Sequence, residues 1–173
     1  MDEELRALSA GIGAALSAAG AVLATAESCT GGWVAEVITA TAGSSAWFDC
    51  GFVTYSNAAK QRLLGVPTSA LAAHGAVSEA VALAMARGAL ANSAATVALS
   101  VTGIAGPGGG VPGKPVGTVC FGWARADGVE RTETRHFDGD REAVRKKSLR
   151  HTLAVLLALL EVPPENSVAR TVP

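Results

Sequence analysis

Hydrophobic positions along the chain follow two patterns, a helical spacing of three or four residues and short unbroken apolar runs. The first pattern predicts a helix over residues 4–19, which Gly20 would end. Four apolar residues carry its spacing: Leu5, Leu8, Ile12 and Leu16. The apolar run 21–25 predicts a short buried strand, and residues 33–39 predict a second helix. The chain is therefore expected to open as helix, strand, helix.

The next part of the chain combines a strand pattern with a capped helix. Residues 51–55 predict a strand, rich in β-branched and aromatic side chains. Ser56 or Asn57 would cap the following helix, which is expected to run to Leu64 and to stop at Gly65. The second strand is thus expected to lead directly into a helix.

A further capped helix precedes a segment with clustered glycines. Ser78 is placed to cap a helix over roughly residues 79–90, and residues 96–101 predict a strand. Residues 102–115 then predict a loop. Clustered glycines let the backbone approach a ligand closely and form anion-binding nests, so this loop is a candidate binding element.

The last third of the sequence predicts a hairpin and one long helix. Residues 116–124 and 130–137 are expected to pair as antiparallel strands around the turn at Asp127-Gly128. Asp140 would start the final helix, which is expected to end at Glu161.

These elements, taken in order, predict the fold class. Crossovers through helices favour a partly parallel sheet, and the hairpin makes that sheet mixed. We therefore predict an α/β protein, a single-domain α/β/α sandwich with a mixed, partly parallel sheet. No internal repeat or linker is apparent, so one domain is expected over residues 1–163, with a flexible C-terminal tail over 164–173.

Composition and charge narrow the partners. The chain has 173 residues, 49% hydrophobic and 17% charged, which is a globular balance. Its net charge of −1, from 14 basic and 15 acidic residues, gives no bulk attraction to nucleic acid or anionic lipid. No nucleic-acid partner is therefore expected.

Two apolar stretches need to be weighed as membrane or export segments. Residues 7–26 lack charge, but the segment before them is acidic, whereas an export signal starts with a positive region. The run 153–160 is far shorter than the roughly 20 apolar residues that span a bilayer. Neither stretch predicts a membrane protein.

The cysteines point to a reducing compartment. Cys29, Cys50 and Cys120 are odd in number, far apart, and without the spacing of a metal site or a disulfide framework. We expect three small buried residues, a cytoplasmic protein, and no metal.

The first candidate for chemistry is Ser28, at a predicted strand-to-helix turn. A serine in such a turn presents its hydroxyl beside free backbone N–H groups, here those of Thr30, Gly31 and Gly32, which could hold an oxyanion or a phosphate. The surrounding residues do not match the G-x-S-x-G elbow. The pattern alone therefore leaves open whether Ser28 is a nucleophile or only a helix cap.

A serine nucleophile needs a base, and Lys60 is the better candidate. None of the histidines, His74, His136 and His151, has a companion motif, so they are interpreted as structural or surface residues. Lys60 is expected in the first helical turn near Arg62, where the helix dipole and the like charge both lower a lysine pKa. The alternative is a solvated helix lysine.

Three more elements could complete a site. Tyr55, at the end of the strand before Lys60, could orient or relay a proton. The glycine loop begins with Thr102. Arg141 and Arg145, four residues apart on the last helix, could grip a phosphate or instead pair with nearby acids on a solvated face.

The combination of motifs resembles the CinA C-terminal domain family, from about Leu5 to Leu160. The resemblance rests on residues 25–32 (TAESCTGG), 51–57 (GFVTYSN) with Lys60, 75–78 (GAVS), 101–107 (VTGIAGP) and 114–119 (KPVGTV). That family includes nicotinamide-nucleotide amidohydrolases, also called NMN deamidases. The resemblance implies an α/β/α domain, a homo-oligomer, and a metal-independent Ser/Lys hydrolase without a cofactor.

Roles are implied for residues that match the family motifs. Ser28 would be the nucleophile, Lys60 the base and Tyr55 its neighbour. The pocket would be lined by Thr102 and its glycine loop, including Gly103 and Gly106, and the substrate would also contact Arg145. Thr30, Gly31 and Gly32 complete the expected substrate-binding set.

The expected reaction is hydrolysis of the carboxamide of nicotinamide mononucleotide (NMN) to nicotinate mononucleotide and ammonia, through an acyl-serine. Whether Arg145 or the loop 102–110 holds the phosphate stays open. The alternative function is a catalytically silent mononucleotide-binding module, or an interaction module associated with competence or repair.

Overall fold

The structure, a computed structural model, describes residues 2–161 of the chain. Its centre is one five-stranded sheet in the order β2-β1-β3-β4-β5. The strands are β1 (Leu23–Glu27), β2 (Phe48–Val53), β3 (Val97–Gly103), β4 (Thr118–Arg125) and β5 (Glu130–His136). β1 pairs in parallel with both β2 and β3, whereas the β3–β4 and β4–β5 pairs are antiparallel. The sheet is therefore mixed.

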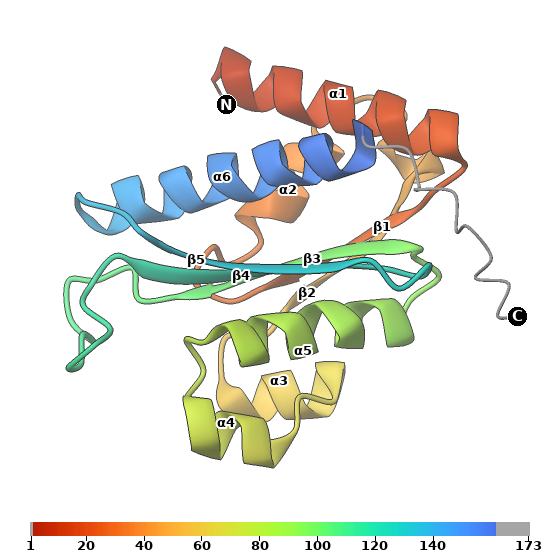
Figure 1. Ribbon diagram of the computed structural model, residues 1–173. Helices are drawn as coiled ribbons and strands as arrows, with labels where there is room; N and C mark the ends of the chain where they lie inside the picture. The colour runs from red at the N-terminus through yellow and green to blue at the C-terminus, as the bar shows by residue number, and fades with distance from the viewer. Residues whose placement is uncertain (1, 162–173) are drawn as a thin grey trace, which may run out of the picture.

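Helices cover both faces of the sheet (Figure 1). One face carries α2 (Trp33–Thr39) and α6 (Arg141–Glu161), with α1 (Glu3–Ala19) packed against α6. The other face carries α5 (Glu79–Ala91), with α3 (Asn57–Leu64) and α4 (Thr68–His74) beyond it. A short 3-10 helix, η1 (Ser44–Ala46), precedes β2. Each face packs a hydrophobic core against the same sheet. Because both layers of helices share this one sheet, the fold is a single α/β domain, as predicted.

Most predicted helix ends are confirmed by their caps. Gly20 ends α1 in a left-handed conformation, with φ of 61°, and its N–H binds carbonyls of the last turn. Ser56 and Ser78 each accept a backbone N–H three residues on and so start α3 and α5. Asp140 likewise accepts the N–H of Ala143 at the start of α6. Each of these caps involves residues that are close in the sequence, so it can be predicted from the sequence alone.

Strand limits differ more from the prediction. β1 begins at Leu23 and reaches Glu27, and β2 lies at Phe48–Val53 instead of residues 51–55. β2 is an edge strand whose residues alternate between half-buried and exposed, so its hydrophobic signal is weak. β3 extends through Thr102 and Gly103, which were expected in the loop. Their pairing with β4 continues the ladder beyond the apolar run.

The prediction missed α4, whose last residue is His74. The helix has no buried residue, and its N-cap residue, Pro67, makes no side-chain hydrogen bond, so neither apolar spacing nor capping signals it. The predicted tail over 164–173 lies outside the described residues. No helix among those described is long and apolar enough to cross a membrane.

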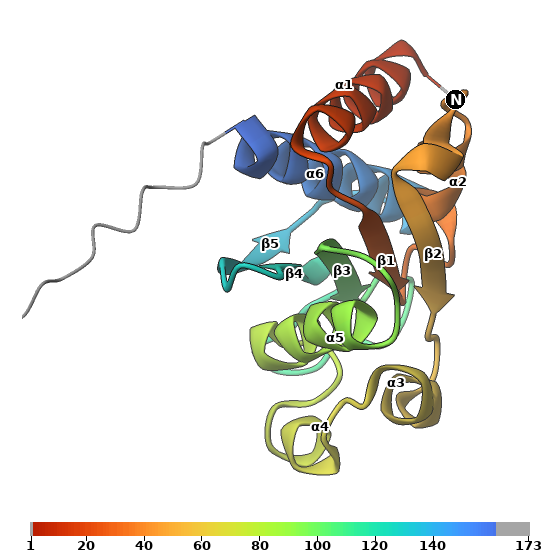
Figure 2. The ribbon, with the colours of Figure 1, turned by 90° about the vertical axis from the view of Figure 1, so that its right-hand side faces the viewer.

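The topology gathers three strand ends at one edge of the sheet. The parallel strands β1, β2 and β3 finish at Glu27, Val53 and Gly103. From β1 the chain passes to α2 on one face, and from β2 it passes to α3 on the other, where the tip of β2 runs into α3 (Figure 2). Connections that leave adjacent parallel strands toward opposite faces open a crevice, which is where such folds bind ligands.

Candidate active site

Ser28 is the first residue after β1 and is held by the two neighbouring strands. Its N–H donates to the Val101 carbonyl of β3 at 2.9 Å, and the Glu27 carbonyl accepts from Thr54, just after β2, at 2.8 Å. The main chain on either side of this residue is thus fixed by sheet-like hydrogen bonds. The Ser28 side chain is 9% exposed and faces a cavity at the strand ends.

Lys60 approaches Ser28 from α3, on the face of the sheet opposite to α2. It lies in α3, directly after the β2 end, and its Nζ is 2.9 Å from Ser28 Oγ and 2.7 Å from the Thr54 carbonyl. The residue is 1% exposed. The structure therefore brings together the two residues that the sequence singled out as nucleophile and base, although they are 32 positions apart.

Burial lowers the pKa of Lys60 from its ordinary value, because a charged ammonium loses its hydration there. A thiolate at Cys29 would oppose this shift, but burial raises the pKa of Cys29 to about 12, so that thiol is uncharged near neutral pH. The sequence argument reached the same direction from the helix start and Arg62. The structural cause is instead the loss of solvent.

The contacts of Lys60 suit a base. A neutral Nζ can keep donating to the Thr54 carbonyl while its lone pair accepts the Ser28 hydroxyl proton. The same geometry with an ammonium would have Nζ donating to both oxygens. A lowered pKa favours the first arrangement, which activates the serine.

The cavity in front of Ser28 has a volume of about 220 Å³. Its lining comes from all three strand ends, from α3, from the segment before α5 and from α6: Ser28, Cys29, Tyr55, Asn57, Lys60, Ala76, Val77, Thr102, Gly103, Ala105 and Arg141. No histidine is among these described residues. Thr102 Oγ1 donates to the Ala76 carbonyl at 2.9 Å and so ties the segment before α5 to β3.

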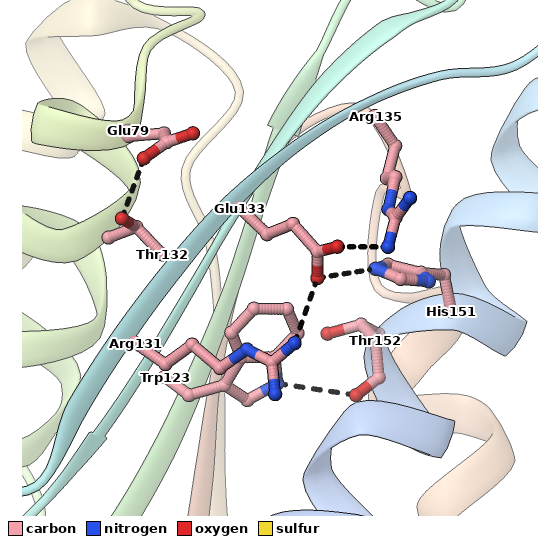
Figure 3. Close-up of polar contacts among 8 residues, drawn as sticks. All are labelled: Glu79, Trp123, Arg131, Thr132, Glu133, Arg135, His151 and Thr152. Atoms are coloured by element: carbon pink, nitrogen blue, oxygen red, sulfur yellow. Dashed lines mark hydrogen bonds and ion pairs between the residues drawn. The ribbon is translucent and has the colours of Figure 1, made fainter.

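The histidines lie elsewhere, in agreement with their interpretation as structural or surface residues. His151 of α6 bonds Glu133 of β5 at 3.0 Å (Figure 3). Its ring also packs edge-on to Phe121. Burial acts against a charged Glu133, but the His151 hydrogen bond and the charges of neighbouring arginines outweigh it and lower the pKa of Glu133. This polar cluster fastens β5 to α6, and β3 and β4 separate β5 from β1, the strand that Ser28 follows.

Tyr55 sits at the mouth of the cavity and is 61% exposed. Its hydroxyl accepts a hydrogen bond from Arg141 Nη2 at 2.7 Å, and Arg141 Nη1 donates to the Gly106 carbonyl at 2.8 Å. Arg141 thus bridges the tyrosine and the glycine loop. Tyr55 lines the same cavity as Lys60, so its expected role beside the base stays a prediction.

Arg145 lines a second, larger cavity of about 560 Å³. That cavity is bounded by α2 and α6 through Gly31, Gly32, Trp33, Glu36, Arg141, Glu142 and Arg145. Arg145 stacks on the Trp33 ring, and its Nε and Nη2 donate to the carbonyls of Cys29 and Thr30 at 3.1 and 2.9 Å. Since Arg141 borders both cavities, the two are neighbours.

The turn after Ser28 corrects one expectation. The amides of Thr30, Gly31 and Gly32 were expected to be free for an oxyanion. The Gly31 N–H instead donates to the Ser28 carbonyl at 3.0 Å, and the Gly32 N–H donates to the Glu27 carboxylate at 3.0 Å. These two glycines line the Arg145 cavity, so a substrate contact there stays a prediction.

Sequence reasoning missed Glu27 and undervalued Arg141. Glu27 caps α2 from five residues before the helix N-cap, Gly32, which has no side chain of its own. A search for capping residues at the helix start cannot find such a partner. Arg141 was paired with Arg145 only by spacing, and nothing in the sequence places it over Tyr55.

Comparison with known proteins identifies the family. Residues 5–160 match the CinA C-terminal domain. A nicotinamide-nucleotide amidohydrolase, PncC of Escherichia coli K12, is 56% identical over 155 residues, which cover 90% of this chain and 94% of that protein. A putative competence-damage inducible protein of Symbiobacterium thermophilum is 53% identical over 163 residues, but the match covers only 38% of its length.

The fold has close counterparts among solved structures. The competence/damage inducible protein CihA from Agrobacterium tumefaciens superposes with a TM-score of 0.89 at 44% sequence identity, over 92% of this chain and 97% of that one. The mixed-sheet architecture described above is therefore shared with CinA-superfamily proteins.

Proposed function

Because this chain belongs to the CinA C-terminal domain family, we propose that it is a nicotinamide mononucleotide deamidase of the Ser/Lys type. The observation that carries the proposal is the buried Lys60 Nζ, 2.9 Å from Ser28 Oγ at the edge of a cavity. The name of the Escherichia coli relative, nicotinamide-nucleotide amidohydrolase, supports an amide as the bond that is broken.

The reaction proceeds in two halves. Neutral Lys60 accepts the Ser28 hydroxyl proton while Ser28 Oγ bonds to the carboxamide carbon of the nicotinamide ring. The tetrahedral intermediate collapses as the C–N bond breaks, and ammonia leaves with the proton that Lys60 returns. Water then attacks the acyl-serine, again giving a proton to Lys60. Ser28 recovers its proton, and nicotinate mononucleotide departs.

The two neighbouring cavities suit the two halves of the substrate. The smaller one, with Thr102 and Gly103 in its wall and Gly106 held by Arg141 at its rim, takes the nicotinamide ring beside Ser28. The ribose and phosphate extend past Arg141 into the cavity that Arg145 lines. Arg145 uses its Nε and Nη2 on backbone carbonyls, so its Nη1 can donate to the phosphate. Tyr55 covers the mouth of the ring cavity.

The family resemblance also supports a homo-oligomer without a cofactor, and the cysteine pattern supports a protein of the cytoplasm. Light scattering coupled to size-exclusion chromatography measures the mass of the particle in solution. A mass equal to one chain across the working concentration range would contradict the oligomer.

The proposal is tested by ammonia release from NMN, measured on chelator-treated protein alongside Ser28→Ala and Lys60→Ala. Release by the unmodified chain, and its loss in both variants, is the expected result. Release that survives Ser28→Ala would contradict the serine nucleophile. No release from any of the three proteins would favour the alternative, a mononucleotide-binding module without turnover.

A further inference from the structure

Glu27 is a buried carboxylate that the reaction described above does not use. The residue is 1% exposed and directly precedes Ser28. Its Oε2 accepts the N–H groups of Gly32 and Val34, each at 3.0 Å, and its Oε1 accepts that of Ala35 at 2.9 Å. A single side chain thus binds three of the backbone donors that would otherwise be unsatisfied at the start of α2.

The other side of the same turn is held by Arg145. Its two hydrogen bonds end on the carbonyls of Cys29 and Thr30, the two residues that follow the nucleophile. Glu27 therefore fixes the amide side of the turn and Arg145 fixes its carbonyl side. The turn includes Gly31 and Gly32, both in the left-handed region with φ of 64° and 97°, which only glycine adopts readily.

These contacts determine where two further N–H groups point. In a planar trans peptide the C=O of one residue and the N–H of the next point in opposite directions. The Cys29 carbonyl faces Arg145, so the Thr30 N–H points away from Arg145 and its cavity. The Ser28 carbonyl accepts from Gly31 inside the turn, so the Cys29 N–H points out of it.

Among residues 2–161 neither the Cys29 amide nor the Thr30 amide donates to another residue, and the Cys29 N–H meets only its own thiol sulfur, whereas the Ser28, Gly31 and Gly32 amides are engaged elsewhere. Cys29 also lines the Ser28 cavity. Unpaired backbone N–H groups beside a nucleophile are suited to stabilise the negative oxygen of a tetrahedral intermediate. In α/β-hydrolases, one oxyanion donor is the backbone N–H of the residue that follows the nucleophile.

We propose that the amides of Cys29 and Thr30 form the oxyanion hole for Ser28, and that Glu27 is the positioning residue that keeps them free and correctly aimed. The inference rests on Ser28 as the nucleophile of the proposed function. It replaces the expected donors at Gly31 and Gly32, because Glu27 and the Ser28 carbonyl already engage those amides.

Glutamine at position 27 is the sharpest substitution. Its shape matches glutamate, but one of its two terminal groups is an NH₂ donor, which would face the backbone N–H of Ala35 or of Gly32 and Val34. At least one of the three hydrogen bonds is lost, and the turn relaxes. Ser9→Ala is the matched control, since Ser9 is also fully buried and bonds Ile38 and Thr41 on the far side of α2.

The experiment measures how fast a fluorophosphonate modifies Ser28, by mass spectrometry of the intact protein. Ser28 Oγ bonds to phosphorus, the P–F bond breaks, fluoride leaves, and Lys60 takes the hydroxyl proton. The rate depends on the nucleophile and on the oxyanion donors, and it needs no NMN. Thermal unfolding and the kcat and KM for NMN are measured on the same proteins, with Ser28→Ala as the blank.

For Glu27→Gln we expect the modification rate and kcat to fall by about 10²-fold, the usual effect of losing an oxyanion donor, with KM changed by less than about threefold. Ser9→Ala should keep both rates while lowering Tm to a similar degree. A folded Glu27→Gln protein with the wild-type modification rate would overturn the proposal. So would an effect confined to KM.

A measurement on the protein without substitutions covers the case in which Glu27→Gln does not fold. Amide resonances of Cys29 and Thr30 are compared by NMR before and after phosphonate modification. Both amide protons should move downfield, because they then donate to the phosphonyl oxygen; unmoved resonances overturn the proposal. If NMN is not a substrate but Ser28 is still modified in the expected way, the proposed function fails and the oxyanion hole stands.

Discussion

Lys60 is the residue at which folding and chemistry oppose each other most directly. A lysine that is 1% exposed gives up the hydration of its ammonium, and the described contacts of its Nζ are two uncharged oxygens. The protein accommodates it by favouring the neutral amine, which lowers the pKa. The burial that costs stability is therefore also what would fit Lys60 for its proposed role as the base.

Replacing Lys60 by Met should abolish most activity and change how stability depends on pH. Loss of a general base commonly costs about 10²–10⁴-fold in rate. Because burial lowers the pKa of Lys60, the unfolded chain binds its proton at a higher pH than the folded chain does. Stability of the unmodified protein therefore rises with pH between the lowered pKa and the ordinary lysine value of about 10.4.

The Met variant lacks this pH-dependent contribution to stability. The Tm of the variant minus the Tm of the unmodified chain should therefore increase as the pH falls from about 10, and become constant below the lowered pKa. Thermal unfolding followed by circular dichroism across this range gives the difference directly. Lys147→Met, at an exposed position of α6, controls for the loss of a lysine charge. A Tm difference that is the same at every pH for Lys60→Met would contradict a buried lysine with a lowered pKa.

Arg145 can be tested as a phosphate contact by Arg145→Ala. A charged hydrogen bond to phosphate contributes about 1.5–3 kcal/mol, so KM for NMN should rise about 10–100-fold. Because Arg145 also holds the Cys29 and Thr30 carbonyls, kcat should fall as well. Steady-state kinetics separate the two effects, with the exposed Arg6→Ala as control. An unchanged KM would remove Arg145 from the substrate-binding residues.

At this scale the sequence predicted the two residues that meet at the cavity, Ser28 and Lys60, but not what supports them. Ser28 and Lys60 stand in recognisable local settings, a strand-to-helix turn and a capped helix start. Glu27 and Arg145 act through backbone groups that are brought near by the fold, and Arg145 is over a hundred positions from its partners. Such contacts carry no local pattern, so they could not be predicted.

Close packing between α3 and α5 depends on a glycine without a side chain. A Cβ at Gly88 of α5 would lie 2.0 Å from the Leu64 carbonyl oxygen of α3, a backbone atom that cannot move aside alone. Gly88→Ala should therefore destabilise the protein by about 1–3 kcal/mol, measured by urea unfolding. Because α3 carries Lys60, the variant should also lose activity.

Gly11 of α1 provides the matched control, since it too is a helix glycine. A Cβ there would approach only the tip of Leu157, at 3.3 Å, which a flexible side chain can relieve. Alanine is favoured over glycine in a helix by about 0.5–1 kcal/mol, so Gly11→Ala should be neutral or stabilising. Equal destabilisation by both substitutions would contradict the packing argument.

The predictability of an element followed how much of its stabilisation is local. Helices with a side-chain cap and a glycine stop, such as α1 and α3, were placed within a residue or so. The edge strand β2 was shifted and α4 was missed. β2 is defined by pairing with β1, and α4 buries none of its residues, so neither shows the hydrophobic spacing that predicts an element.

At the scale of the molecule, the site exists because the chain continues from β1 to β2 on one side of it and then to β3 on the other. The chain leaves β1 and β2 toward opposite faces, and the crevice between these connections holds Ser28 on one wall and Lys60 on the other. α6 closes the crevice with Arg141, which borders both cavities, and with Arg145. Binding of a substrate that fills both cavities should therefore tie the two helical layers together.

If NMN is the substrate, this coupling predicts a large thermal shift in the Ser28→Ala variant, which is expected to bind NMN without turning it over. At about a hundredfold excess over Kd, a ligand that binds only the folded state adds about 2.7 kcal/mol. For a chain of this size Tm rises by about 2–4 °C per kcal/mol, which gives a shift of about 5–10 °C. Differential scanning fluorimetry of the variant measures it.

Nicotinamide riboside separates the two halves of the site, because it fills the ring cavity and lacks the phosphate. If Arg145 holds the phosphate, the riboside should shift Tm far less than NMN does at the same concentration. Adding Arg145→Ala to the Ser28→Ala variant should then reduce the Tm shift with NMN to the level seen with the riboside. Equal shifts for both ligands would place the recognition in the ring cavity alone. The larger cavity beside Trp33 would then have no part in binding NMN.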